Sequence, residues 1–207
     1  MTMREVPYIL TMCSARDPSR TSIVIGANSL GFSTTYENPP LVRAIGIDPG
    51  SRFTGYGVVE GDGRRLRHIG SGVIRLRAQL TFPERLRVIY EELLGVIEGS
   101  EPHCMAVEEV FIARNVRSAL LLGHARGVAI LAGVNSGLSI FEYSPLLIKQ
   151  AVVGYGRAEK DQVQNMVQHL FGIREPLNSN ASDALAVAIC HLNTHSSRAR
   201  WALAKQP

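Results

Sequence analysis

The sequence has little cysteine, little charge and no long uninterrupted apolar run. It contains only three cysteines (Cys13, Cys104 and Cys190), which lie far apart and form no C-x-x-C pair. This argues against a disulfide framework and against a zinc site, so a reducing cytoplasm is the expected compartment. The apolar stretch over residues 119–134 is interrupted by a histidine and an arginine, so we expect no membrane span and no membrane partner.

The rest of the composition is typical of a globular protein. The chain has 207 residues, of which 45% are hydrophobic and 19% are charged. One main domain with a sizeable core is therefore expected. The formal net charge of +4 is compatible with a nucleic-acid partner without requiring one.

The composition divides the chain into three parts. Residues 1–40 are rich in Ser, Thr, Asn and Gly and end in a Pro-Pro pair, so we expect a disordered leader or an extension from an upstream start codon. Residues 41–195 carry regular apolar patterns and form the expected domain. Residues 196–207 are basic and are expected to form a frayed tail.

Apolar periodicity and turn signals predict alternating strands and helices after residue 40. Five strands are expected, over 42–48, 54–60, 66–76, 105–111 and 139–143. Five helices are expected, over 81–99, 115–135, 145–153, 159–171 and 180–193. The first of these helices begins with a capping box formed by Thr81 and Glu84. The order of elements predicts an α/β fold in which a mixed five-stranded sheet has helices on both faces.

Acidic residues fall at the ends of three predicted elements. Asp48 closes the first strand and precedes a Pro-Gly pair, so it could also simply start a turn. Glu108 lies late in the fourth strand. The first and fourth strands are expected to be neighbours, so these carboxylates can meet at one edge of the sheet. Because side chains alternate along a strand, the pattern leaves open whether Glu108 or Glu109 faces Asp48. Asp183 shares a face with Asn180 at the start of the last helix, where an acid also suits the helix terminus.

Such a group of carboxylates predicts a metal site. Closely spaced carboxylates cannot all stay ionised without a cation, and oxygen ligands favour Mg²⁺ or Mn²⁺. Two ions about 3.5–4 Å apart are the usual device for in-line phosphodiester hydrolysis. None of the six histidines repeats at a zinc spacing, and the nearest pair, His191 and His195, is expected at the surface of a fraying helix end.

Five segments resemble the RuvC-type Holliday-junction resolvases, in order and with the right spacing between Val42 and His195. They are G-I-D-P-G-S-R-F-T-G-Y-G-V-V (46–59), A-V-E-E-V-F (106–111), A-R-G-V-A-I (125–130), V-V-G-Y-G-R-A-E-K (152–160) and S-D-A-L-A-V-A-I (182–189). The resemblance implies a ribonuclease-H-like fold and a homodimeric, metal-dependent endonuclease. It would nick opposing strands of a four-way DNA junction and work with a RuvAB-type branch-migration complex.

The resemblance also implies which residues form the catalytic site. Asp48, Glu108 and Asp183 match the acids that hold two Mg²⁺ or Mn²⁺ ions, and Glu108 rather than Glu109 matches the fourth-strand acid. The family usually has a further acid one turn before the last, where this chain has Asn180. Asn180 is therefore a candidate catalytic residue and metal ligand that offers an amide oxygen in place of a charge.

Basic and aromatic residues complete the implied site. Lys149 and Lys160 match residues that serve catalysis or DNA binding, and Arg114 is a further candidate for DNA binding. Phe111 matches an aromatic residue that stacks on bases near the junction centre, although it would equally well end a strand in the core.

Two alternatives belong to other functional classes. Actin-like and sugar-kinase-like phosphotransferases share the D-x-G hairpin, but they need a second lobe, for which the chain after Val42 is too short. A junction-binding module without catalysis would be consistent with Asn180. Metal-dependent nicking of a synthetic junction distinguishes the three, and the acids and lysines favour the active nuclease.

Overall fold

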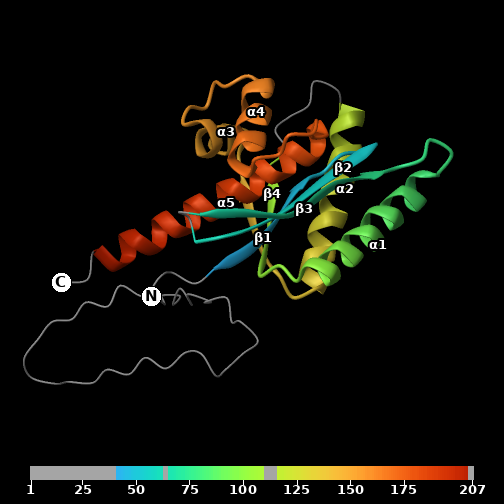
Figure 1. Ribbon diagram of the computed structural model, residues 1–207. Helices are drawn as coiled ribbons and strands as arrows, with labels where there is room; N and C mark the ends of the chain where they lie inside the picture. The colour runs from blue at the N-terminus through green and yellow to red at the C-terminus, as the bar shows by residue number, and fades with distance from the viewer. Residues whose placement is uncertain (1–40, 63–64, 110–115, 205–207) are drawn as a thin grey trace, which may run out of the picture. The chain divides into compact units, whose positions relative to one another are not determined.

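The computed structural model describes residues 41–62, 65–109 and 116–204, and of residues 195–204 it describes only the backbone. The elements in these ranges are β1 (Val42–Asp48), β2 (Phe53–Gly61), β3 (Leu66–Arg75), α1 (Phe82–Ser100), β4 (Cys104–Glu108), α2 (Val116–Asn135), β5 (Ser139–Tyr143), α3 (Pro145–Val153), α4 (Lys160–Phe171) and α5 (Ser179–Ala204). Figure 1 shows the strands forming one layer with helices on both sides. The predicted arrangement of a mixed five-stranded sheet between helices is confirmed.

The strands lie in the order β3-β2-β1-β4-β5. β1 and β3 run antiparallel to β2, whereas β4 runs parallel to both β1 and β5. Ile47 of β1 pairs with Val107 of β4. The next residue in each strand is acidic, so Asp48 and Glu108 end neighbouring parallel strands at the same edge of the sheet.

Side-chain alternation divides the core between the two faces of the sheet. Ala44 and Ala106 lie in a buried cluster with residues of α3, α4 and α5. Ile45 and Val107 lie in a second cluster with residues of α1 and α2. The helices after β5 therefore cover one face, and the two helices that flank β4 in the chain cover the other, as Figure 1 shows.

α1 begins as predicted but ends differently. The capping box is confirmed, since the backbone N–H of Thr81 donates to Glu84 at 2.7 Å. The predicted end at Gly99 is wrong, because the helix continues through that residue and its left-handed cap is Glu101, with φ of 46°. Pro102 follows directly and cannot continue a helix.

Two other predicted ends are also wrong. α5 does not stop near Asn193 but continues to Ala204, and no glycine or proline lies between these residues to end it. β4 ends at Glu108 rather than at Phe111, and its partner β5 ends opposite, at Tyr143. Phe111 itself lies outside the described residues.

His191 is buried, which corrects the prediction that it lies at the surface. It is 1% exposed, and its ring nitrogens lie 2.8 Å from the hydroxyl of Tyr143 and 3.1 Å from the thiol of Cys104. The prediction failed because α5 passes over β4 and β5 where the helix was expected to fray. The side chain of His195 lies outside the described residues.

α2 is a long apolar helix whose surface is only partly covered. It is long and apolar enough to cross a membrane, but core helices of soluble proteins can be equally long and apolar. Ala125, Ala129 and Ala132 pack into the core beneath it. Val116 and Leu120 on the helix are 74% and 59% exposed.

Candidate active site

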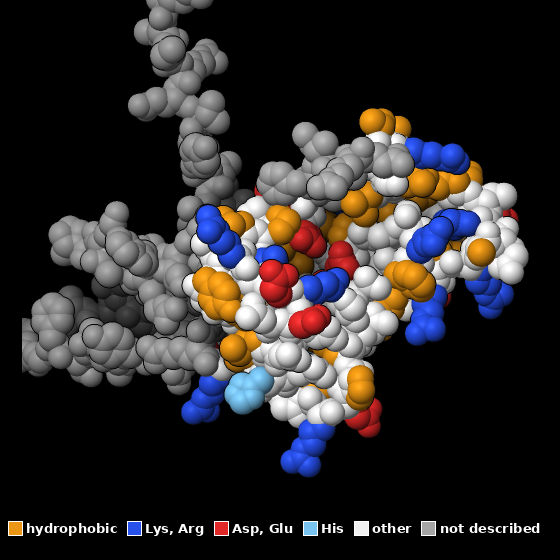
Figure 2. Space-filling view, turned by 90° about the horizontal axis from the view of Figure 1, so that it is seen from above, with side chains coloured by type: hydrophobic (Ala, Val, Ile, Leu, Met, Phe, Trp, Pro, Cys, Tyr) orange, Lys and Arg blue, Asp and Glu red, His pale blue; other side chains and the backbone are white. Residues whose placement is uncertain are grey.

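A hollow of about 360 Å³ lies at the edge of the sheet where β1 and β4 end. Its lining consists of Asp48, Glu108, Pro145, Ile148, Lys149, Lys160, Val163, Asn180, Asp183 and Ala186. Figure 2 looks down on this face and shows acidic side chains gathered around basic ones in a depression. The hollow thus combines three acids, two lysines and an amide from five different elements.

The two strands present their acids on the same face. Asp48 is four residues after Ala44 and Glu108 is two residues after Ala106, so each acid points to the same face of its strand as that alanine. Both alanines pack in the cluster that contains α5. Glu109 is two residues after Val107, so it points to the face on which Val107 packs against α1 and α2. The structure therefore brings Glu108, not Glu109, to the hollow.

α5 brings the third acid to the same place. The helix begins at Ser179, and the side-chain oxygen of Asn178 accepts a 3.0 Å hydrogen bond from the backbone N–H of Asn180. Asn180 and Asp183 both line the hollow from the first turns of this helix. Behind them Leu185 and Ile189 are fully buried, as their apolar spacing predicted.

α3 and α4 contribute one lysine each. α3 starts at the N-cap residue Ser144, whose side chain accepts from the backbone N–H of Leu147, and it carries Lys149. α4 starts with a capping box at Glu159, and Lys160 is its first residue. Nζ of Lys160 donates a 2.5 Å hydrogen bond to Oδ2 of Asp183, so the ammonium group is held against the acidic cluster.

The clustering changes the acidity of these groups. Burial, followed by the charges of Asp183 and Glu108, raises the pKa of Asp48 to about 7. Burial and then Asp183 raise the pKa of Glu108, while Lys160 opposes both shifts. Partial burial tends to lower the pKa of Lys160, but the hydrogen bond to Asp183 and the surrounding acids outweigh it and raise that pKa.

The residues present fit a hard divalent cation. Each carboxylate raises the cost of ionising its neighbours, a cost that a bound cation relieves, and the donors are all oxygens. In this arrangement the cation in contact with Asp183 is the ammonium of Lys160. In the part of the chain that is described, no three acidic, histidine or cysteine side chains are grouped so that they could hold an ion as they stand.

The structure brings together six of the eight residues singled out in the sequence. Asp48, Glu108, Asp183, Asn180, Lys149 and Lys160 all line the hollow. Phe111 and Arg114 lie outside the described residues. The apolar lining residues Pro145, Ile148, Val163 and Ala186 were not singled out, because apolar residues at helical spacing predict a core rather than a site.

Comparison with known proteins gives a consistent result. Residues 44–191 match the family model "Crossover junction endodeoxyribonuclease RuvC". The chain is 54% identical over 153 residues to a protein of that name from Geobacter sulfurreducens, covering 74% of this chain and 93% of the relative. A relative of the same name from Magnetococcus marinus is 51% identical over 152 residues, covering 73% and 84%.

Solved structures agree with the sequence comparison. The structure of "T. thermophilus RuvC in complex with Holliday junction substrate" matches with a TM-score of 0.72 and 33% identity, covering 76% of this chain and 96% of that one. The yeast mitochondrial Holliday junction resolvase Ydc2 matches with a TM-score of 0.57 at 13% identity, covering 82% and 86%, which shows the fold alone. The expected ribonuclease-H-like fold is confirmed.

Proposed function

The chain belongs to the RuvC family of crossover junction endodeoxyribonucleases, and we propose that it cuts four-way DNA junctions at the hollow lined by Asp48, Glu108 and Asp183. The observation that carries this assignment is the meeting of three acids and two lysines in one hollow, within the matched range 44–191. An enzyme of this family acts as a nuclease, and the related Thermus thermophilus protein has been captured with a Holliday junction.

The proposed reaction is hydrolysis of a DNA phosphodiester. Asp48, Glu108 and Asp183 would hold divalent ions, Mg²⁺ or Mn²⁺ and two per site, which when bound supply an activated water and stabilise the leaving oxygen. Lys149 lines the same hollow, where its ammonium would bind the phosphate and hold the strand over the acids. Lys160 is paired with Asp183 when no metal is present. Once divalent ions balance the charge of the acids, its ammonium would be free to contact the phosphate.

Asn180 is the position at which this site departs from the family pattern. It lines the hollow one turn before Asp183. Its amide offers a neutral oxygen, so the site carries one negative charge fewer than four acids would. We propose that this weakens binding of Mg²⁺, which gives up its waters reluctantly, more than binding of Mn²⁺.

We further propose that the enzyme acts as a homodimer formed through α2. Val116, Leu120, Leu131 and Val134 on this helix are 50–74% exposed. A Cβ atom on Gly123 or Gly127 would meet nothing within 4 Å, so a second copy of the helix can approach closely there. A symmetric pair would place two active sites on opposing strands, as paired nicks require.

We also propose a compartment and a motor partner. Free thiols on the buried residues Cys104 and Cys190 agree with a reducing compartment such as the cytoplasm. A RuvAB-type branch-migration complex as partner rests on the family resemblance alone.

The test is metal-dependent nicking of a synthetic four-way junction against a linear duplex of the same sequence. We expect paired nicks in the junction only. Glu108→Gln should abolish nicking and keep junction binding, because phosphate contacts supply most of the affinity. Glu109→Gln is the matched control and should nick at nearly the normal rate. Equal activity of both variants would contradict the assignment, and junction binding without nicking by the unmodified chain would indicate a non-catalytic module.

The lysines are tested by the salt dependence of binding. Lys149→Ala and Lys160→Ala should each weaken binding, catalysis or both. A residue that contacts phosphate should lower the slope of log affinity against log salt by about one counterion when it is removed. Unchanged slopes together with unchanged turnover would make these lysines solvated surface charges.

A further inference from the structure

The loop between α3 and α4 carries an exposed aromatic ring. Tyr155 is 49% exposed, and Arg157 in the same loop is also exposed. The loop joins the helix that carries Lys149 to the helix that begins with Lys160, and both lysines line the hollow. Tyr155 thus lies on the short connection between two basic residues of the site.

Close contacts hold this loop against α3. Gly154 caps the helix with φ of 87°, and its N–H donates a 2.9 Å hydrogen bond to the carbonyl of Gln150. At Gly156 a Cβ atom would lie 2.7 Å from a methyl carbon of Leu146. The chain therefore turns back along the face of α3 that carries Leu146 and Gln150, which fixes the place of Tyr155 between the two glycines. Lys149 of the hollow is the residue before Gln150 on the same helix.

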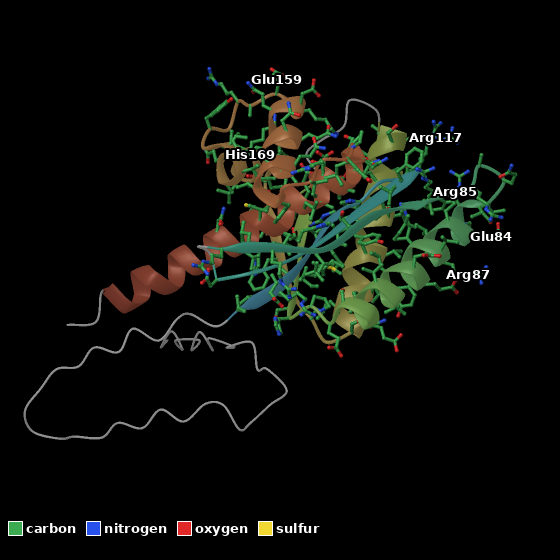
Figure 3. The ribbon with its side chains drawn as sticks, in the orientation of Figure 1. Glu84, Arg85, Arg87, Arg117, Glu159 and His169 are labelled. Atoms are coloured by element: carbon green, nitrogen blue, oxygen red, sulfur yellow. The ribbon has the colours of Figure 1, made fainter. Side chains whose placement is uncertain are left out.

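Figures 2 and 3 together place one end of the loop on the side of the molecule from which the hollow is seen. Glu159, the N-cap of α4, stands at the upper end of the α3–α4 pair in Figure 3. Figure 2 is seen from above this end and looks into the hollow. A strand of DNA lying over the acids would thus pass close to the loop.

No hydrogen bond or ring contact within the described ranges explains the position of Tyr155. Tyr90 and Tyr143 use their hydroxyls in 2.8 Å hydrogen bonds to Asn135 and His191. Within ranges 41–62, 65–109 and 116–194, Tyr155 makes no hydrogen bond and stacks on no other ring. A half-exposed ring of this kind leaves apolar surface in contact with water and adds little to the stability of the fold.

We propose that Tyr155 stacks on a nucleobase next to the phosphodiester that is cut, and so helps to set which nucleotide is accepted there. This rests on the proposed nuclease function of the same site. An aromatic face with basic side chains around it is the usual means of holding a base that has left the helical stack, since every base offers a π-face and the strand offers phosphates. Arg157, Lys149 and Lys160 supply the basic surroundings.

The experiment is an abasic scan combined with substitutions at residue 155. The full-length protein is titrated, without divalent metal, against a synthetic junction of fixed core in which single nucleotides around the cut are replaced by abasic sites. For the unmodified protein we expect one position whose loss weakens binding roughly 5- to 100-fold, the range for one stacked base. Tyr155→Ala should weaken binding of the intact junction by a similar factor and lose no more at that position.

Two further variants separate stacking from other effects. Tyr155→Phe keeps the ring and should behave like the unmodified protein. Leu170→Ala removes a comparably exposed apolar side chain that lies about 15 Å along α4 from Lys160, and it should leave the whole scan unchanged. A set of junctions that differ only in the base at the sensitive position is then nicked in the presence of Mg²⁺ or Mn²⁺. The differences in nicking rate among these junctions should become smaller in Tyr155→Ala and stay unchanged in the other two variants.

The outcomes distinguish this inference from the function on which it rests. The stacking role would be overturned if the loss from Tyr155→Ala added to the loss from the abasic site at every position. It would also be overturned if Tyr155→Phe weakened binding as much as Tyr155→Ala. Junction-selective nicking would stand in both cases. A protein that bound the junction no better than a linear duplex would overturn both.

Discussion

Gly55 in β2 lies directly under the first turn of α5, so close that a Cβ atom on it would lie 2.0 Å from the carbonyl oxygen of Asn180. Gly55 is also the residue paired with Asp48 in the β1–β2 ladder. The absence of a side chain at one position thus lets α5 reach the sheet beside Asp48. Gly46 does the same two residues before Asp48, where a Cβ would lie 2.1 Å from the carbonyl of Ala184.

Gly55→Ala is expected to damage the site more than the fold. The new methyl group must push the start of α5 away, which should lower the free energy of unfolding by roughly 1–3 kcal/mol and separate Asp183 from Asp48. Nicking should fall at least tenfold at temperatures where the variant is fully folded. Gly70→Ala is the control, because a Cβ at this β3 glycine meets nothing within 4 Å; equal effects of both substitutions would contradict the packing argument.

Asp48→Asn is expected to stabilise the metal-free protein at high pH. The pKa of Asp48 is raised to about 7, above its usual value of about 4, so the folded state binds the proton more tightly than the unfolded state. The stability from this proton is present at low pH and is lost as the pH rises through 7. Asn stays neutral, so its advantage should be small at pH 4, grow up to pH 7 and stay level above.

The size of this effect follows from the pKa shift. One pKa unit corresponds to about 1.4 kcal/mol, so the advantage of Asp48→Asn above pH 7 is on the order of 2–4 kcal/mol. Urea unfolding with EDTA at several pH values measures it, with Glu109→Gln as a control that should show no such dependence. A variant less stable than the unmodified protein at pH 8 would show that Asp48 ionises without cost.

Asn180→Asp should strengthen the response to Mg²⁺. The added carboxylate restores one negative charge in the hollow, so half-maximal nicking should shift to lower Mg²⁺ and the gap between Mg²⁺ and Mn²⁺ should narrow. The melting temperature of each protein with Asp48 retained, titrated with Mn²⁺ in the absence of DNA, gives a second readout. Superimposable curves for both proteins would make Asn180 a residue of the helix start and not a ligand.

The two cysteines of the domain should resist alkylation in the folded protein. Burial raises the pKa of Cys190 to about 11, and Cys104 is 3% exposed and lies 3.1 Å from His191. In a Cys13→Ser background we expect no reaction with iodoacetamide at pH 8 until urea unfolds the chain, since the thiolate is the nucleophile. Mass spectrometry that found rapid labelling of either cysteine would contradict the close packing of α5 on the sheet.

Removal of residues 1–40 is expected to leave nicking and dimer formation intact. The family match begins at residue 44, and β1 begins at Val42. Activity and the sedimentation profile of the truncated chain measure this. A truncated chain that no longer formed a soluble dimer would show that the leader contributes to the interface.

The sequence alone predicted every strand and helix of the described domain to within a few residues, except for the ends of β4 and α5. This worked because local signals agree with the fold: the capping box at Thr81, the Pro-Gly turn after Asp48 and the apolar spacing of the helices. The end of α5 was missed because a helix without a glycine or proline stops where its contacts stop. His191 was misplaced for the same reason, since its burial depends on β4 and β5 far away in the chain.

The sequence by itself also predicted an acid at the end of β1, one late in β4 and one near the start of α5, and the family resemblance linked them. The residue pattern by itself left open which of two adjacent glutamates faces the hollow; the resemblance favoured Glu108, and only the tertiary structure gives the physical reason for that choice. Alternation along a strand gives two faces of equal standing, and nothing local says which face a distant helix will cover. α5 lies on the face of Gly46 and Gly55 because only there can its backbone reach the sheet, and this places Glu108 inside and Glu109 on the opposite face.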